Sequence, residues 1–80
     1  MIIKVLGSGC ANCHKLEALA VKAAEQLGIH ADIVNLTEYP EIMAYGVMST
    51  PALVVDEQLV LSGRVPSYDE VVTLLSRLSD

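Results

Sequence analysis

Apolar and polar positions follow two different periods in the first third of the chain. Residues 2–6 (Ile-Ile-Lys-Val-Leu) are mostly apolar and β-branched, and Gly7-Ser8-Gly9 follows them, which predicts a buried strand and a tight loop. A helical period comes next, with apolar residues at i, i+3, i+4, i+7, i+8 and i+11: Leu16, Leu19, Ala20, Ala23, Ala24 and Leu27. Gly28 then stands where a left-handed C-cap belongs. This segment is the most clearly defined helix in the sequence.

The middle of the chain predicts a second strand and a short helix. The strand covers Ala31–Leu36, which is mostly apolar. Pro40 suits the first turn of a helix that runs through Ile42 and Tyr45, and Gly46 comes just after its end.

Two short apolar runs then predict a pair of strands, at Ala52–Val55 and Leu59–Leu61. The segment Asp56-Glu57-Gln58 that joins them is too short for anything but an antiparallel hairpin. Because Asp-Glu lacks the glycine that a two-residue hairpin turn prefers, we expect a longer or irregular turn.

The last segment has the start signal of a helix. Ser67 is followed three positions later by Glu70, as in a capping box, and an apolar stripe comes after it: Val71, Leu74, Leu75 and Leu78. The element order is therefore β-α-β-α-β-β-α. The right-handed crossover rule places the first two strands parallel and adjacent, with the long helix packed over them. We predict an α/β fold with a central mixed four-stranded sheet and helices on both faces.

Composition limits the chain to one small globular domain, residues 1–80. Hydrophobic residues make up 52% of the 80 positions and the mean hydropathy is +0.47, which excludes a disordered chain. The longest purely apolar runs, Ala18–Val21 and Ala52–Val55, are far shorter than the roughly 20 residues of a membrane-spanning helix. We expect no membrane association.

The charge balance disfavours some classes of binding partner. The formal net charge of −5 argues against binding to nucleic acid or to anionic membrane surfaces, because both require basic side chains. The opening Met1-Ile2-Ile3-Lys4 is too short an apolar run for a signal peptide. We therefore expect a cytoplasmic protein, and we expect it to be a monomer.

The two cysteines, Cys10 and Cys13, carry the candidate chemistry. They stand three positions apart, so a disulfide between them would close almost no loop and would be a weak structural staple. Such a pair in a reducing compartment is more often reactive or metal-binding. Cys10 comes at the mouth of the long helix, where backbone N–H groups and the helix dipole favour a thiolate, so we predict a pKa below the usual value of about 8.5. Cys13, one turn later, should be the more buried residue and would resolve the mixed disulfide that Cys10 forms.

The cysteine pair is also compatible with metal or haem binding. A zinc site generally needs four ligands, and His14 and His30 are the other candidates. Cys10, Cys13 and His14 also match the c-type haem attachment motif, but the missing signal peptide and the strand-rich pattern weigh against it. A soft-metal carrier or sensor for Cu(I) or Zn remains the alternative, because thiolates select soft metals. Copper chaperones usually end in a strand, however, whereas this chain ends in a predicted helix. We predict no resident metal and no cofactor.

The motifs and their order resemble those of the thioredoxin superfamily. The resemblance rests on Cys10-Ala11-Asn12-Cys13 at the start of a long helix and on residues 45–51 (Tyr-Gly-Val-Met-Ser-Thr-Pro) leading into a strand. More narrowly, residues 7–13 and 61–67 resemble those of the small, glutaredoxin-sized thioredoxin-like redox-active disulfide proteins of bacteria and archaea. The similarity covers nearly the whole chain and implies a thioredoxin-like fold.

This resemblance implies a thiol–disulfide oxidoreductase that acts on protein disulfides, with Cys10 and Cys13 as its catalytic residues. It also implies that Pro51 is cis and lies beside Cys10, and that the backbone of Thr50 offers a short strand edge to an extended substrate. Gly63 would permit that substrate to approach closely. A reductase of the kind that serves thioredoxins would supply the electrons.

The chain also departs from thioredoxin near the cysteine pair. Gly9 stands where thioredoxin has a Trp, and the dipeptide between the cysteines is Ala11-Asn12 rather than Gly-Pro. We expect this dipeptide, together with His14, to modulate the cysteine pair. The first strand carries Lys4 and no carboxylate, so thioredoxin's buried acid has no counterpart there. The group that deprotonates Cys13 is left open by the sequence.

Overall fold

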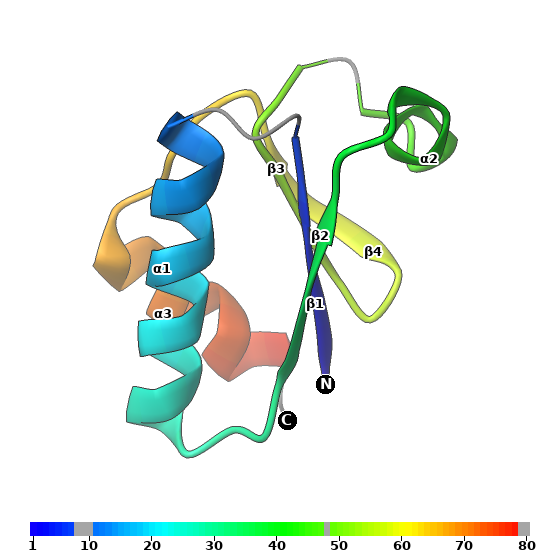
Figure 1. The fold of residues 1–80 in the computed structure, drawn as a ribbon. Helices are drawn as coiled ribbons and strands as arrows, with labels where there is room; N and C mark the ends of the chain where they lie inside the picture. The colour runs from blue at the N-terminus through cyan, green and yellow to red at the C-terminus, as the bar shows by residue number, and fades with distance from the viewer. Residues whose placement is uncertain (8–10, 48, 79–80) are drawn as a thin grey trace.

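The computed structural model describes residues 1–7, 11–47 and 49–78. Over these residues the elements follow the predicted order (Figure 1), and the strand bounds differ from the predicted ones by one residue at most. The elements are β1 (Ile2–Leu6), α1 (Ala11–Leu27), β2 (Asp32–Leu36), α2 (Tyr39–Ala44), β3 (Ala52–Val55), β4 (Gln58–Ser62) and α3 (Tyr68–Leu78).

The strands form a mixed sheet in the order β2-β1-β3-β4. β1 pairs with β2 in parallel, from Ile2 opposite Asp32 to Leu6 opposite Leu36. β3 is antiparallel to both of its neighbours, β1 and β4. The predicted four-stranded sheet, with its first two strands parallel and adjacent, is therefore confirmed for the described residues.

One face of the sheet is covered by α1 and α3, which lie together on the same side in Figure 1. Alternate residues of β1, Ile3 and Val5, point toward this layer and are buried. The inner face of α1 is rich in alanine, whose small side chain lets the helix pack close to the sheet. The buried residues of this core are Ile3, Val5, Leu16, Ala20, Ala23, Ala24, Leu53, Val55, Leu61, Val71 and Leu75.

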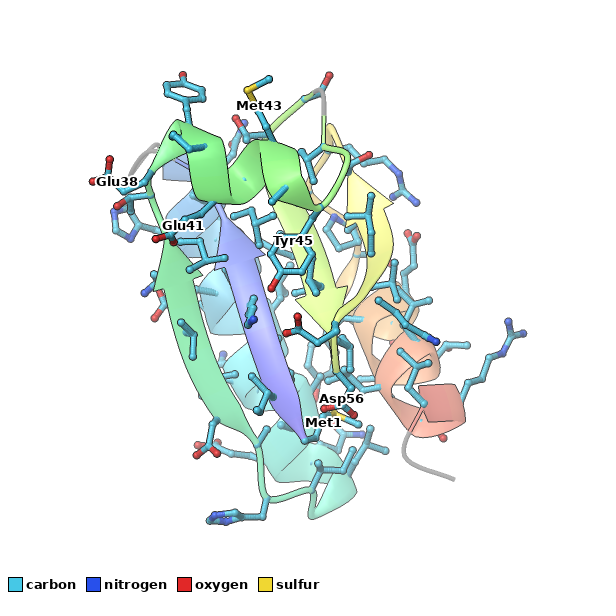
Figure 2. The ribbon with its side chains drawn as sticks, turned by 90° about the vertical axis from the view of Figure 1, so that its right-hand side faces the viewer. Met1, Glu38, Glu41, Met43, Tyr45 and Asp56 are labelled. Carbon is cyan, nitrogen blue, oxygen red and sulfur yellow. The ribbon has the colours of Figure 1, made fainter. Side chains whose placement is uncertain are left out.

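The other face of the sheet is covered by α2 at one end. Figure 2 shows α2 crossing the end of the sheet where β1 and β2 finish, while no helix of the described residues lies over the opposite end of this face. Ile42 of α2 packs with Leu6, Val47, Ala52 and Val54 in a second, smaller core. Because Val47 and Ala52 flank residues 49–51, this smaller core supports the Thr-Pro segment.

The expectation of a longer turn between β3 and β4 is wrong. Val55 pairs with Gln58, so Asp56 and Glu57 form a two-residue turn, with φ values of 48° and 71°. Both values lie in the left-handed region that glycine usually fills in such turns. The side chains offset this cost, because Asp56 Oδ1 accepts a hydrogen bond from the backbone N–H of Ile2 at 2.9 Å and Glu57 binds Lys4. The irregularity lies instead in the strand pairing, where the register shifts between Leu53 and Val54.

The helix ends follow the sequence signals. Gly28 has a φ of 68° at the end of α1, as expected for a left-handed cap. At the start of α3, the backbone N–H of Glu70 donates to Ser67 Oγ at 3.2 Å, which is one half of the capping box. The carboxylate of Glu70 pairs with Arg64. Within the described ranges, every helix is too short or too polar to cross a membrane.

Candidate functional site

Cys13 lies in the first turn of α1, close to the end of β1. Its side chain is buried, with 6% exposed, and it is disulfide-bonded. Cys10, the predicted nucleophile, lies outside the described residues. The neighbouring positions that we expect to modulate the pair, Ala11, Asn12 and His14, are exposed. The described part of the site is therefore a buried sulfur at a helix start, with the exposed residues Ala11, Asn12 and His14 next to it in the chain.

Gly7 is in close contact with this sulfur. A Cβ atom placed on Gly7 would lie 2.2 Å from Cys13 Sγ and 3.3 Å from Cys13 Cβ, so a larger residue would require one of them to move. The backbone N–H of Gly7 donates to the carbonyl of Leu36 at 2.9 Å, which holds this position against the end of β2. In the sequence, Gly7 stands out only as part of a loop signal, and nothing local connects it with Cys13.

The Thr-Pro segment and Gly63 come together at the same end of the sheet. The peptide bond between Thr50 and Pro51 is cis. Pro51 is buried and Thr50 is exposed, and the Pro51 carbonyl accepts a 2.9 Å hydrogen bond from the backbone N–H of Gly63. Gly63 has a φ of 79°, and a Cβ there would lie 3.2 Å from Ser49 Cβ. Both its conformation and its surroundings therefore favour glycine.

Gly7 lies between the cysteine and the Thr-Pro segment. The same Cβ position that would contact Cys13 Sγ lies 3.8 Å from Thr50 Cβ. The fold thus brings together Cys13 from α1, Gly7 from the end of β1 and Thr50 from the segment before β3. Two of the sequence-predicted site residues, Cys13 and Thr50, meet across a glycine that was not predicted as part of the site.

A small cavity of about 110 Å³ opens beside Cys13. Its lining comes from β1, from α1 and from the end of β2, and consists of Val5, Gly7, Cys13, His14, Glu17, Asn35 and Thr37. Glu17, Asn35 and Thr37 were not among the predicted site residues. Two signals for them were present: Glu17 follows Cys13 by four positions on a helix, and Asn35 pairs with Val5 in the parallel register.

The clearest electrostatic interaction lies on the other face of the sheet. Lys4 Nζ donates hydrogen bonds to Glu57 and to Tyr45 Oη, and lies 5.1 Å from the centre of the Tyr45 ring. The hydrogen bond to Glu57, then that to Tyr45, raises the pKa of Lys4, and the same bond from Lys4 lowers the pKa of the Glu57 carboxyl. Since Ile3 and Val5 face α1 while Lys4 faces α2, this group lies on the face away from Cys13.

A second ion pair lies next to Gly63. Arg64 donates to both carboxylate oxygens of Glu70, one of them at 2.9 Å. This hydrogen bonding raises the pKa of Arg64 and lowers that of Glu70. The pair connects the end of β4 to the first turn of α3. Among residues 1–7, 11–47 and 49–78, no three His, Cys, Asp or Glu side chains gather to hold a metal ion.

A mixed sheet covered on both faces, with a disulfide-bonded cysteine at the start of its first helix and a cis-proline before β3, defines the class of thioredoxin-like α/β domains. Comparison with known proteins gives the family. The model of the thioredoxin domain family matches residues 1–76. The chain therefore belongs to this family, and it is a thiol–disulfide oxidoreductase.

Two curated relatives, both named thioredoxin, are similar to the chain over most of its length. One, from Methanothermobacter thermautotrophicus, is 41% identical over 76 residues, covering 95% of this chain and 99% of the relative. The other, from Methanocaldococcus jannaschii, is 37% identical over 71 residues, covering 89% of this chain and 81% of the relative. A solved structure, thioredoxin 1 from Thermosipho africanus, matches the fold with a TM-score of 0.63 at 20% identity, covering 99% of this chain and 94% of that one.

Proposed function

We propose that the protein exchanges disulfides with protein clients through Cys10 and Cys13. In the reductive direction the Cys10 thiolate attacks a client disulfide, one client sulfur leaves as a thiolate that takes a proton from solvent, and a mixed disulfide remains. The Cys13 thiolate then attacks Cys10 Sγ, the second client thiol leaves, and two electrons have passed to the client. The observation that carries this proposal is the buried, disulfide-bonded Cys13 in the first turn of α1.

The position of Cys10 in the sequence supports its role as nucleophile. It directly precedes Ala11, the first residue of α1, and α1 is 17 residues long. The unpaired N–H groups and the positive end of such a helix favour the anionic form of a thiol. We predict a pKa for Cys10 below the usual value of about 8.5. Ala11, Asn12 and His14, exposed around this position, would modulate it.

Thr50, Pro51 and Gly63 form the proposed client platform. Thr50 is exposed and lies near Gly7, while Pro51 is buried and bonded to Gly63. An extended client segment would pair with the backbone of Thr50 by strand addition. Gly63 has no side chain to obstruct it. This arrangement would place a client disulfide at the end of the sheet where β3 begins, next to the start of α1.

The remaining features of the function follow from the same proposal. The electron donor is a reductase of the type that serves thioredoxins, and no cofactor takes part. The net charge of −5 makes nucleic acids and anionic membranes poor partners. We propose that the domain works as a monomer in the cytoplasm.

The test is disulfide exchange by the purified protein in a dithiol or glutathione redox buffer, with insulin as the client. We expect reversible cycling and client reduction, abolished by Cys10→Ser. Cys13→Ser should instead accumulate a mixed disulfide with the client, because the second step is lost. Thiolate absorbance against pH should give a Cys10 pKa below that of a free thiol. Failure to cycle would refute the proposal, and stoichiometric copper without reductase activity would favour the soft-metal carrier.

A further inference from the structure

The resolving step requires Cys13 to lose a proton, and its surroundings make this difficult. Its side chain is 6% exposed. Removal from water disfavours a thiolate, so a buried thiol reacts faster near neutral pH when a proton acceptor lies nearby. Lys4, on the preceding strand, faces α2 and is bound to Glu57 and Tyr45. Since Lys4 is the titratable side chain of β1, this strand supplies no proton acceptor for Cys13.

The cavity beside Cys13 contains a suitable carboxylate. Glu17 is half-buried and follows Cys13 by one helical turn, so both side chains lie on the same face of α1 and line the same cavity. The volume of about 110 Å³ exceeds the roughly 30 Å³ that one water occupies in the liquid. Asn35, near the end of β2, and Thr37, just after it, also line the cavity and add polar partners for such a water. The cavity can thus hold a hydrogen-bonded path from the sulfur to the carboxylate.

We propose that the Glu17 carboxylate accepts the proton of Cys13 through a water in this cavity. The inference rests on the proposed function of the cysteine pair. The Cys13 S–H bond breaks, the proton passes through the water to Glu17, and the resulting thiolate attacks Cys10 Sγ in the mixed disulfide. The Cys10–client S–S bond breaks, and the client sulfur leaves as a thiolate that takes its proton from solvent. In the reverse direction, Glu17 returns the proton to Cys13.

The charged groups around Glu17 are compatible with this role. Of the described residues that line the cavity with Cys13, His14 and Glu17 are the other titratable ones. His14 also lines the cavity but is exposed, whereas Glu17 is half-buried and lies one helical turn from Cys13. His14, Lys22 and Glu25 share the outer surface of α1 with Glu17, and β2 contributes the uncharged Asn35. Among the described residues that line the cavity, Glu17 is the one with a carboxylate.

The experiment separates the two thiol steps in a single turnover. Reduced protein is mixed with an aromatic disulfide whose released thiolate absorbs visible light. The first absorbance phase reports the attack by Cys10, and the second reports the attack by Cys13. We expect Glu17→Gln to slow the second phase on the order of 100-fold near neutral pH, the lower end of what a positioned proton acceptor contributes. In Glu17→Gln the rate of the second phase should rise tenfold per pH unit, up to the pH at which the Cys13 thiol is largely ionised in solution.

The controls keep the inference distinct from the proposed function. Glu25→Gln makes the same change of charge two turns further along α1, away from Cys13, and should leave both phases unchanged. Glu17→Asp keeps a carboxylate and should restore part of the rate and the pH profile. The role of Glu17 would be overturned if the second phase were equally fast in Glu17→Gln and in the native protein. It would also be overturned if His14→Gln, and not Glu17→Gln, slowed the second phase. A native protein without a second phase would refute the proposed function itself.

Discussion

Gly7 has no side chain at the point where the chain leaves β1 beside Cys13. The 2.2 Å between Cys13 Sγ and the position of a Cβ on Gly7 is far shorter than any van der Waals contact between these atoms. A Cβ on Gly7 would also lie 3.8 Å from Thr50 Cβ. Because glycine has no side chain there, α1 and the Thr-Pro segment can approach one another. Sequence inspection identifies the glycine but not its neighbours, because Thr50 is more than forty positions away.

Gly7→Ala should therefore disturb the site as well as the fold. The added methyl forces Cys13 or the backbone to shift, and such overpacking costs about 1–3 kcal/mol of unfolding free energy. We expect a lower urea midpoint and altered rates in both phases of the aromatic disulfide reaction. Gly28→Ala is the control, because nothing lies within 4 Å of its Cβ position, so it should lower stability through its φ of 68° while exchange rates stay unchanged. Native stability and native rates in Gly7→Ala would contradict this account.

At the scale of elements, the β3–β4 hairpin shows how side chains far along the chain decide a local structure. Asp56 and Glu57 both have positive φ, which the local sequence argues against. The turn is nevertheless formed because each side chain has a partner on β1: Asp56 binds the N–H of Ile2, and Glu57 binds Lys4. A rule based on turn residues could not include these contacts, since β1 is more than fifty positions earlier.

The Lys4–Glu57 pair gives the hairpin a pH dependence. Lys4 lowers the pKa of Glu57, so the pair contributes stability above the ordinary carboxyl value of 4.5, and this contribution is lost as the pH falls through the lowered pKa. Glu57 and Tyr45 raise the pKa of Lys4 above its ordinary value of 10.5, so the contribution of the pair to stability is fully present below pH 10.5. It is lost as the pH rises through the raised pKa of Lys4. We expect Glu57→Gln to lower the urea midpoint at neutral pH. The difference from the native protein should disappear in acid, where protonated Glu57 resembles glutamine.

The matching control for the hairpin is Glu25→Gln, which removes one carboxylate from α1. Because both residues are exposed, the effects are small and are best compared at low salt, where screening is weakest. A difference between Glu57→Gln and the native protein that persists unchanged into acid would show that the ion pair is not its source.

At the scale of the molecule, the sequence predicted the architecture well because local periods and connection lengths determine it. The 3.6-residue period of α1, the crossover between β1 and β2, and the short β3–β4 connection together leave few possible arrangements of the sheet. The site was predicted only in part. Thr50, Pro51 and Gly63 came from the family resemblance, and Glu17 lies one helical turn from Cys13 on the same helix. Gly7 and Asn35, in contrast, lie near Cys13 through contacts between elements. Such contacts depend on how α1 lies on the sheet, which no local pattern in this chain specifies.

The two cores on opposite faces of the sheet should differ in their effect on function. Ile3 belongs to the core under α1 and α3, and Ile42 belongs to the core under α2, which also contains Val47 and Ala52 on either side of the Thr-Pro segment. Both isoleucines are almost fully buried, so Ile3→Ala and Ile42→Ala should each lower the unfolding free energy by about 2–5 kcal/mol. Only Ile42→Ala removes support from beneath the proposed client platform. We therefore expect it to lower kcat/KM for a protein disulfide about fivefold more than Ile3→Ala does, which corresponds to about 1 kcal/mol.

The comparison of these two variants requires that both stay folded. Rates are measured in a sulfate buffer, because sulfate strengthens the burial of apolar side chains. Each rate is divided by the folded fraction, which is measured by circular dichroism. The small aromatic disulfide serves as a second substrate, because it reacts with the cysteines without needing the platform. It should react equally fast with both variants, so the difference belongs to client binding. Equal losses toward the protein client would mean that the smaller core has no special part in holding Thr50 and Pro51.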